Sequence, residues 1–355
     1  MKIALSCDHI IERNQAITIL EMVSSIYEDA EIFTIAHKQG SVLGPIEQKK
    51  IRSTFLSHNV KDKDHFHQRG FLVPTASKNL HIPCNFDLVI NISSGLSQGI
   101  KRCETTKVIT YFLPEHDQMR KNKKWWEFLF SPYLKQWAEN NLRECDLIWV
   151  PDEGTKEILE DRLGGDKEIK VVYPFFNIQD FPLIPSSYWK HDFFAIDTAE
   201  LDVKLAREIF DLVTKSGSRG IFVGPDSHLE KLKKEKGDKN FFGQRCTGEL
   251  APFLASSRGH ISLRTNGFPD LALKALSVGR PVIVRDTEIY REYLSGEGVT
   301  FLPHLADQVI LDSLEDLNSN HKKLDGKKVR AQVMKFAPQK FKGYLLRTLD
   351  NFSLN

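Results

Sequence analysis

RGHISLRTNGFPDLALKALSVGRPVIVRD, residues 258–286, is the segment from which the architecture of this chain follows. A short β-branched run at 260–263 enters a Thr-Asn-Gly turn, and an apolar helical pattern follows with Pro269 near its first turn. Gly279 ends that helix, and the run 281–284 begins the next strand. Such a unit directs backbone N–H groups and the positive end of the helix dipole beyond the first strand, so the turn is a candidate phosphate site.

The same alternation continues through the rest of the chain. Further strands are expected at 2–7, 30–35, 86–92, 107–112, 145–150, 169–172, 193–196, 220–224 and 297–302. Helical patterns lie at 15–27, 156–163, 205–214, 247–255 and 336–352. Alternating strands and helices predict an α/β protein with parallel sheets. The polar segment 39–80 is expected to be irregular.

Length and composition indicate two domains in a soluble globular protein. A chain of 355 residues is too long for one ordinary domain, and two of roughly 150 to 200 residues each are the default. Hydrophobic residues make up 41% and charged residues 27%, which is the usual globular balance. The net charge of +2 does not favour a nucleic-acid-binding protein, so no nucleic-acid partner is expected.

Cysteine and histidine usage does not point to a metal centre. The five cysteines are scattered and form no CxxC pair, which predicts neither a disulfide framework nor a zinc site. His65 and His67 stand two residues apart without a matching carboxylate, and a solvated loop is favoured over metal ligation there. The run 1–6 is too short for a signal sequence, and no run of roughly 20 apolar residues exists. A cytoplasmic protein is therefore expected.

The most biased segment is RKNKKWWEFLFSPYLKQW, residues 120–137. Its first residues are basic, and large amphipathic rings follow, a mixture that suits the interface of an anionic membrane. Peripheral membrane contact through Arg120 to Phe130 is one interpretation. The alternative is a helix packed in the first domain with its lysines in water.

Three matches in the opening segment carry a resemblance to a known family. Gly267-Phe268, Ala275-Leu276 and Gly279-Arg280-Pro281-Val282-Ile283 resemble, in register, the donor-binding segment of the family 4 glycosyltransferases. Residues 169–181 are similar to the segment that joins the two domains of that family. The resemblance implies the GT-B fold, with two Rossmann-like domains whose parallel sheets face a central cleft. It places an acceptor-side domain at 1–178, a nucleotide-sugar donor domain at 190–335, and a terminal helix at 336–355 that packs back on the first domain.

The resemblance also shows where this chain departs from the family. In similar enzymes one glutamate contacts the transferred sugar and a second binds ribose hydroxyls, and Asn266 and Lys274 occupy those positions here. Leu201 and Asp202 occupy the positions of the basic pair that clamps the diphosphate. Asn14 and Gln15 replace the paired glycines of the first loop, and the predicted element that begins at Gly220 lacks the family's second glycine.

A phosphate clamp built from other residues would compensate for these losses. Arg264, Lys274 and Arg245 supply cations, and Gly267 and Phe268 supply backbone amides. The alternative for Lys274 is an ion pair with Asp270, four residues earlier on the helix. The residues predicted to bind the donor are Asn14, Gln15, Gly224, Gly243, Arg245, Arg264, Gly267, Phe268, Asp270, Leu271 and Lys274. Glu115, His116 and Asn266 are the predicted catalytic residues, because 113–117 follows a strand in the loop where the family places a histidine beside the sugar.

Three functions remain open on this basis. The first is a hexosyltransferase that moves a sugar from a nucleotide sugar to a glycan or lipid-linked acceptor, as in the synthesis of cell-surface polysaccharide or lipopolysaccharide. The second is a catalytically inactive GT-B homologue that acts as a partner or scaffold subunit. The third is a nucleotide-sugar epimerase or another sugar-phosphate enzyme on the same fold. No metal or other cofactor is expected, and the nucleotide sugar is a substrate.

Overall fold

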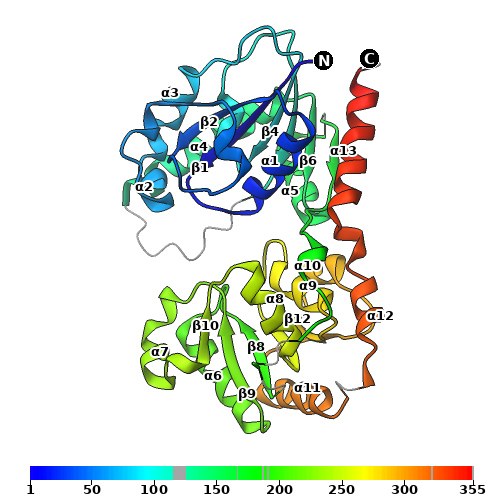
Figure 1. Ribbon diagram of the computed structural model, residues 1–355. Helices are drawn as coiled ribbons and strands as arrows, with labels where there is room; N and C mark the ends of the chain where they lie inside the picture. The colour runs from blue at the N-terminus through cyan, green and yellow to red at the C-terminus, as the bar shows by residue number, and fades with distance from the viewer. Residues whose placement is uncertain (115–124, 166, 186–187, 190–191, 321–322, 354–355) are drawn as a thin grey trace. The chain divides into compact units, whose positions relative to one another are not determined.

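The computed structural model describes residues 1–114, 125–165, 167–185, 188–189, 192–320 and 323–353, with the backbone alone at 125–129 and 351–353. It divides into two compact units: the first is coloured blue to green with the red C-terminal helix, and the second green to orange (Figure 1). The first comprises Met1–Pro174 and Phe341–Asn355, and the second comprises Phe175–Lys340. Each unit contains a parallel sheet with helices, which confirms the predicted two-domain α/β architecture.

The sheet of the first unit has seven parallel strands in the order β3-β2-β1-β4-β5-β6-β7. Their bounds are β1 Ile3–Ile10, β2 Glu31–His37, β3 Ile51–Ser53, β4 Leu88–Ser93, β5 Lys107–Phe112, β6 Leu147–Val150 and β7 Ile169–Val171. All residues of β1 and β4 are buried, as apolar runs covered on both faces require. The strand order reverses between β1 and β4, which makes that edge the switch point of the sheet.

Strand β1 continues three residues beyond the predicted end at Cys7. Its last residues pair with β2, His9 with Ala36 and Ile10 with His37. The predicted end of the strand at Cys7 was therefore too early, because a polar residue remains in a buried strand when its groups are hydrogen-bonded. Asp8 meets that condition through a loop that follows β4.

The segment 39–80 is more regular than its polarity predicted. It contains β3 and two short helices, α2 Lys63–Gln68 and α3 Val73–Lys78. Phe66 and Val73 are buried in the core of the first unit. His65 and His67 lie on α2, so the expectation of an irregular segment was wrong: isolated apolar residues anchor short helices that periodicity does not detect.

The remaining helices of the first unit are α1 Gln15–Ile26, α4 Trp125–Arg143, α5 Glu153–Leu163 and the C-terminal part of α13 Pro338–Ser353. Phe341 and Tyr344 of α13 pack beside Tyr111 and Trp149, with ring centroids 6.0 and 5.8 Å apart. This packing confirms that the C-terminal helix returns to the first unit (Figure 1). Within the described residues, every helix is too short or too polar to cross a lipid bilayer.

One disulfide joins Cys84 to Cys103. Cysteine spacing did not predict it, because scattered cysteines reveal their pairing only when the fold brings them together. Here a parallel bridge between His81 and Lys101 does so, with the N–H of Ile82 bonded to the Lys101 carbonyl at 2.8 Å. The prediction of no disulfide framework was therefore incomplete.

The sheet of the second unit has six parallel strands in the order β10-β9-β8-β11-β12-β13. Their bounds are β8 Phe193–Asp197, β9 Arg219–Val223, β10 Phe241–Gly243, β11 Gly259–Ser262, β12 Val282–Arg285 and β13 Val299–Leu302. The helices are α6 Val203–Lys215, α7 Glu230–Lys236, α8 Thr247–Ser256, α9 Asp270–Ser277, α10 Glu288–Tyr293, α11 Asp307–Asn320 and α12 Gly326–Ala331. The strand order reverses between β8 and β11, so the segment 258–286 lies at the switch point.

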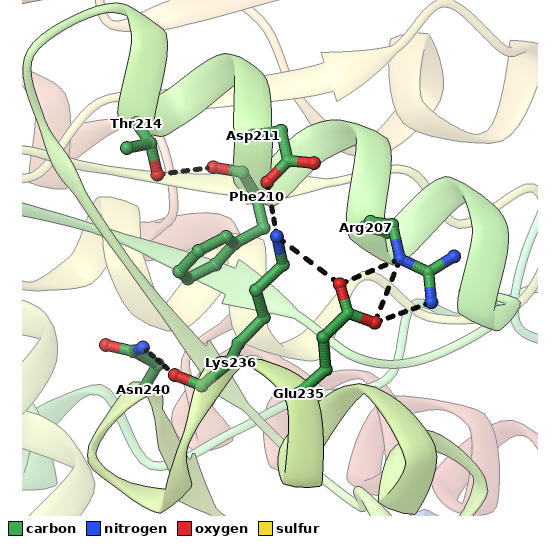
Figure 2. Close-up of polar contacts among 7 residues, drawn as sticks. All are labelled: Arg207, Phe210, Asp211, Thr214, Glu235, Lys236 and Asn240. Carbon is green, nitrogen blue, oxygen red and sulfur yellow. Dashed lines mark hydrogen bonds and ion pairs between the residues drawn. The ribbon is translucent and has the colours of Figure 1, made fainter.

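Charged side chains link α6 to α7 on the surface of the second unit (Figure 2). Arg207 donates to both carboxylate oxygens of Glu235, at 2.7 Å to Oε2 and 3.2 Å to Oε1. Lys236 bonds Asp211 at 2.7 Å and lies 3.5 Å from Glu235. Exposed ion pairs contribute little individually, so this network orients α7 and the buried core supplies most of the stability.

Candidate functional site

The candidate site lies at the carboxyl edge of the second sheet, where its strand order reverses. Strands β8 and β11 are neighbours, and their last residues are Asp197 and Ser262. In sheets of this type ligands bind beyond the carboxyl ends of the strands at that point. The loops 198–202 and 263–269 therefore form the walls of the candidate site.

A buried polar group underlies these loops. The carboxylate of Asp197 accepts hydrogen bonds from the Ala199 N–H and the Ser262 hydroxyl, both at 2.9 Å. The Ser262 hydroxyl lies 2.6 Å from the Tyr290 hydroxyl. Burial raises the pKa of Asp197, against the lowering effect of the Arg264 charge, and burial also raises the pKa of Tyr290. Asp197, Ser262 and Tyr290 are almost fully buried, so this group lies beneath the two loops and supports them.

Glu200 joins the two loops. One of its carboxylate oxygens accepts the N–H of Thr265 at 2.8 Å and the Thr265 hydroxyl at 2.7 Å. Its other oxygen lies 3.9 Å from Nε of Arg264. Glu200 also adopts a left-handed backbone conformation with φ of 61°, which is unusual for a residue other than glycine. Strain of this kind persists where surrounding contacts fix it, and it concentrates at functional sites.

The turn before α9 presents backbone amides to the same edge. Gly267 has φ of 76°, which a residue without a Cβ adopts at little cost, and Pro269 precedes the first helical residue. The first bond within the helix runs from the Leu273 N–H to the Pro269 carbonyl, at 3.0 Å. The N–H groups of Leu271 and Ala272 therefore lie in the part of the helix that has no internal acceptor. This geometry is the anion-binding arrangement expected for the turn.

Lys274 and Asp270 form an ion pair on α9. The ammonium lies 2.6 Å from the carboxylate, one helical turn away. The lysine also lies 5.6 Å from the centre of the Phe181 ring. Of the two interpretations of Lys274, the structure therefore has the pair with Asp270, and this carboxylate opposes the attraction of the lysine for phosphate.

Gly224 brings a third strand to the same edge. It follows β9 with φ of 112°, and a Cβ there would lie 2.6 Å from the Thr198 hydroxyl and 3.8 Å from the Leu271 side chain. Its N–H donates to the Gly243 carbonyl at 3.1 Å. A side chain at 224 would displace Thr198, so the glycine permits close approach of the strand ends.

The replaced basic pair has a structural explanation. Leu201 is buried at 1% exposure, and the Asp202 side chain caps α6 by accepting the N–H of Leu205 at 2.8 Å. Lys204, the first cation after these two residues, is exposed and lies 3.8 Å from Glu208. These positions therefore serve the helix, and Arg264 is the cation nearest the turn in sequence.

Three further predicted site residues, Asn14, Gln15 and Arg245, do not belong to α9 or to the turn before it. Asn14 is the N-terminal cap of α1 in the first unit, its side-chain oxygen accepting the Ile17 N–H at 2.9 Å, and Gln15 is the first residue of that helix. Arg245 stands 5.5 Å over the ring of Phe242, beside β10. The predicted catalytic residues Glu115 and His116 lie outside the described residues. Asn266 lies in the turn and donates to the Thr265 hydroxyl at 2.9 Å.

The switch point of the first unit is closed by its own carboxylate. Asp8 accepts the N–H groups of Ser94 and Ser97 at 2.6 and 2.7 Å, the Leu96 N–H at 3.3 Å, and the hydroxyls of Ser93 and Ser94. Consecutive amides that converge on one point form an anion-binding nest. Because Asp8 occupies this nest, an external anion has no access to these amides in the first unit.

The charges at the second unit's site are balanced within the chain. Glu200 lies beside Arg264, and Asp270 pairs with Lys274, so two carboxylates balance two cations. Among the described residues, no three histidine, cysteine or acidic side chains are grouped so as to hold a metal ion. An anion would meet backbone amides, the Arg264 guanidinium beside Glu200 and the Lys274 ammonium beside Asp270. Asp197, Glu200 and Tyr290 were missed from the sequence; the only available signal was that Asp197 directly follows a buried strand.

Comparison with known proteins places this architecture among solved structures. No protein-family model matches the chain, and no curated protein matches its sequence. Sucrose-phosphate synthase from Thermosynechococcus elongatus superposes with a TM-score of 0.73 at 12% identity, over 100% of both chains. Anabaena HepE in complex with UDP gives 0.70 at 14% identity, over 99% of this chain and 100% of HepE. The lipopolysaccharide outer core galactosyltransferase WaaB gives 0.64 at 16% identity, over 98% of this chain and 100% of WaaB. The chain therefore has the GT-B fold, built of two Rossmann-like units with parallel sheets.

Proposed function

We propose that this protein is a glycosyltransferase that moves a hexose from a nucleotide sugar to a glycan or lipid-linked acceptor in the synthesis of cell-surface polysaccharide or lipopolysaccharide. The observation that carries the proposal is the turn 264–269, which opens α9 at the switch point of the second sheet. Similar structures support it, because one contains UDP and another is a galactosyltransferase of the lipopolysaccharide outer core.

In the proposed reaction the site binds the diphosphate of the donor and stabilises the charge that develops as the nucleotide departs. The amides of Leu271 and Ala272 contribute at the start of α9, and Arg264 contributes a guanidinium. These groups supply positive potential without a metal or another cofactor. Asn266, Glu115 and His116 remain the proposed residues beside the sugar.

A transfer assay with mass-spectrometric detection tests this function. The full chain is incubated with UDP- and GDP-hexoses and with lipid-linked or free oligosaccharide acceptors. Growth of an acceptor by one hexose mass supports the proposal, and its loss in Arg264→Ala ties it to the site. A matched control is Arg207→Ala, because Arg207 lies in the surface network of α6 and α7 (Figure 2). Conversion of the donor sugar without an acceptor would instead identify an epimerase.

A second candidate function is that of an inactive GT-B homologue that serves as a partner or scaffold subunit. The observation that favours it is that Arg264 and Lys274 each already face a carboxylate of this chain. A site of balanced charge attracts a diphosphate less than one with free cations. This candidate predicts no binding of any nucleoside diphosphate, whereas a transferase binds its donor nucleotide.

The proposed location is the cytoplasm, with peripheral contact to the inner face of the membrane through Arg120 to Phe130. Residues 120–124 of that segment lie outside the described residues, and at 125–129 only the backbone is described. Its described part supports the proposal, because Phe130 and Tyr133 on α4 are 42% and 53% exposed. Phe71 is 42% exposed and lies 5.7 Å from Phe130, ring centre to ring centre. Exposed aromatic rings of this kind suit the boundary between lipid head groups and acyl chains. Co-sedimentation with anionic and with neutral lipid vesicles tests the proposed membrane contact. Equal recovery of the protein in the supernatant with both kinds of vesicle would contradict it.

A further inference from the structure

A cavity lies in the second unit away from α9. Helix α9 follows β11, whereas the cavity lies beyond β9, on the other side of β8 in the strand order. It has a volume of about 550 Å³ and lies along β10, an edge strand that β9 separates from β8. Pockets of about 300 to 1,000 Å³ are typical of small-molecule sites. The segment before β8, the start of β9 and the residues around β10 line it.

Packed aromatic rings form one wall of this cavity. Phe242 stacks on Phe253 of α8 with ring centres 4.0 Å apart and planes 4° apart. Trp189 contacts both rings, at 5.8 and 5.1 Å between ring centres. Because these contacts restrict its rotation, the indole of Trp189 is a fixed wall.

Charged groups surround the aromatic wall. Three lining residues are cations, Arg219, Lys239 and Arg245, and two are carboxylates, Asp192 and Asp238. The Arg219 guanidinium donates to the Lys239 carbonyl at 2.7 Å, which fixes its position. The three lining cations outnumber the two carboxylates by one, and among the described residues Lys239 and Arg245 form no ion pair.

We propose that this cavity binds a saccharide that carries an acidic group. The indole of Trp189 offers an apolar face to a sugar ring, while sugar hydroxyls donate to Asp192 and Asp238 and accept from the neighbouring cations. The unpaired Lys239 and Arg245 then receive the carboxylate or phosphate of the acidic group. This site is separate from the turn 264–269 and does not depend on transfer activity.

Calorimetric titration of the full chain tests the proposal, with a hyaluronan tetrasaccharide as the acidic probe and cellotetraose as the neutral one. Saturable binding is expected for the acidic probe, and the neutral probe is expected to bind at least about tenfold more weakly because it lacks the charge-assisted contacts. The double variant Lys239→Ala with Arg245→Ala should weaken the acidic probe by about tenfold or more. The matched control is Lys231→Ala with Lys234→Ala on α7, two exposed lysines that do not line the cavity and should leave affinity unchanged.

Two further measurements separate this site from the proposed donor site and from misfolding. Saturating UDP should leave the tetrasaccharide affinity unchanged, and competition by UDP would overturn the proposal. Circular dichroism melting of each variant establishes that it is folded. No binding of the acidic probe, equal binding of cellotetraose, or equal losses in the two double variants would each contradict the assignment.

Discussion

The carboxylate of Glu200 accepts two hydrogen bonds from Thr265, one from its N–H at 2.8 Å and one from its hydroxyl at 2.7 Å. This relationship connects the loop after β8 to the loop after β11, the two strands between which the order of the second sheet reverses. It also holds a negative charge 3.9 Å from Arg264 at the edge where a diphosphate is proposed to bind. The affinity of the site for an anion therefore depends on a carboxylate of the chain itself.

Glu200→Gln should increase the affinity for UDP, because the amide keeps the shape of the side chain but removes the charge that opposes phosphate at Arg264. We expect an increase of about fivefold, equivalent to about 1 kcal/mol of relieved repulsion. Calorimetric titration measures it, and Glu208→Gln on α6 is the matched control. An unchanged affinity would show that Arg264 does not contact the phosphate.

The ion pair on α9 allows an opposed pair of substitutions. Asp270→Asn should tighten UDP binding by a few-fold and Lys274→Gln should weaken it, because only the first leaves the ammonium without its carboxylate. The cost in stability should be small in both variants, about 0.5 kcal/mol for a partly buried ion pair one helical turn apart. Changes of the same sign in both variants would exclude a role for Lys274 in binding phosphate.

The sequence predicted the parallel strands at both switch points and the helix after the turn. These elements depend on local apolar runs such as 193–196 and 282–284, and Gly279 marks the end of the helix. It did not predict the pairing of Glu200 with Thr265, which lie 65 residues apart and meet only through the sheet order. The disulfide between Cys84 and Cys103 was missed for the same reason. Spacing along the chain carries no information on such contacts.

Asp8→Ala should destabilise the first unit strongly. The substitution leaves the N–H groups of Ser94 and Ser97 buried without their acceptor, and we expect a loss of about 2 to 4 kcal/mol. Urea unfolding of the variant measures it, with Asp29→Ala on the surface as the control. A loss below that of the control would mean that water replaces the carboxylate without cost.

His260→Leu should reduce the dependence of stability on pH. Burial lowers the pKa of His260 from its ordinary value of 6.5 to about 3, so the imidazole stays neutral in the folded protein. Between these values the unfolded chain takes up a proton that the folded chain does not, and stability falls as the pH falls through that range. The free energy of unfolding should therefore drop by up to about 1 kcal/mol per pH unit more in the wild type than in the variant. Parallel curves from pH 7 to pH 4.5 in urea would contradict this account.

The structural role of Asp8 also shows why sequence reasoning ended β1 too early. A charged residue usually marks the end of a buried strand, yet the loop that satisfies Asp8 lies 86 residues later in the chain. The same limit applies to Asn14, whose role as the N-terminal cap of α1 the resemblance did not indicate. In both cases the side chain is committed to a backbone partner that only the fold identifies.

Calorimetric titration of the full chain with UDP and GDP tests the central claim most directly, since that claim is a diphosphate bound at the start of α9. We expect saturable binding of one of the two nucleotides with a stoichiometry near one, weakened about tenfold or more by Arg264→Ala through loss of a charge-assisted contact. The absence of heat with both nucleotides, or binding that Arg264→Ala leaves intact, would contradict it.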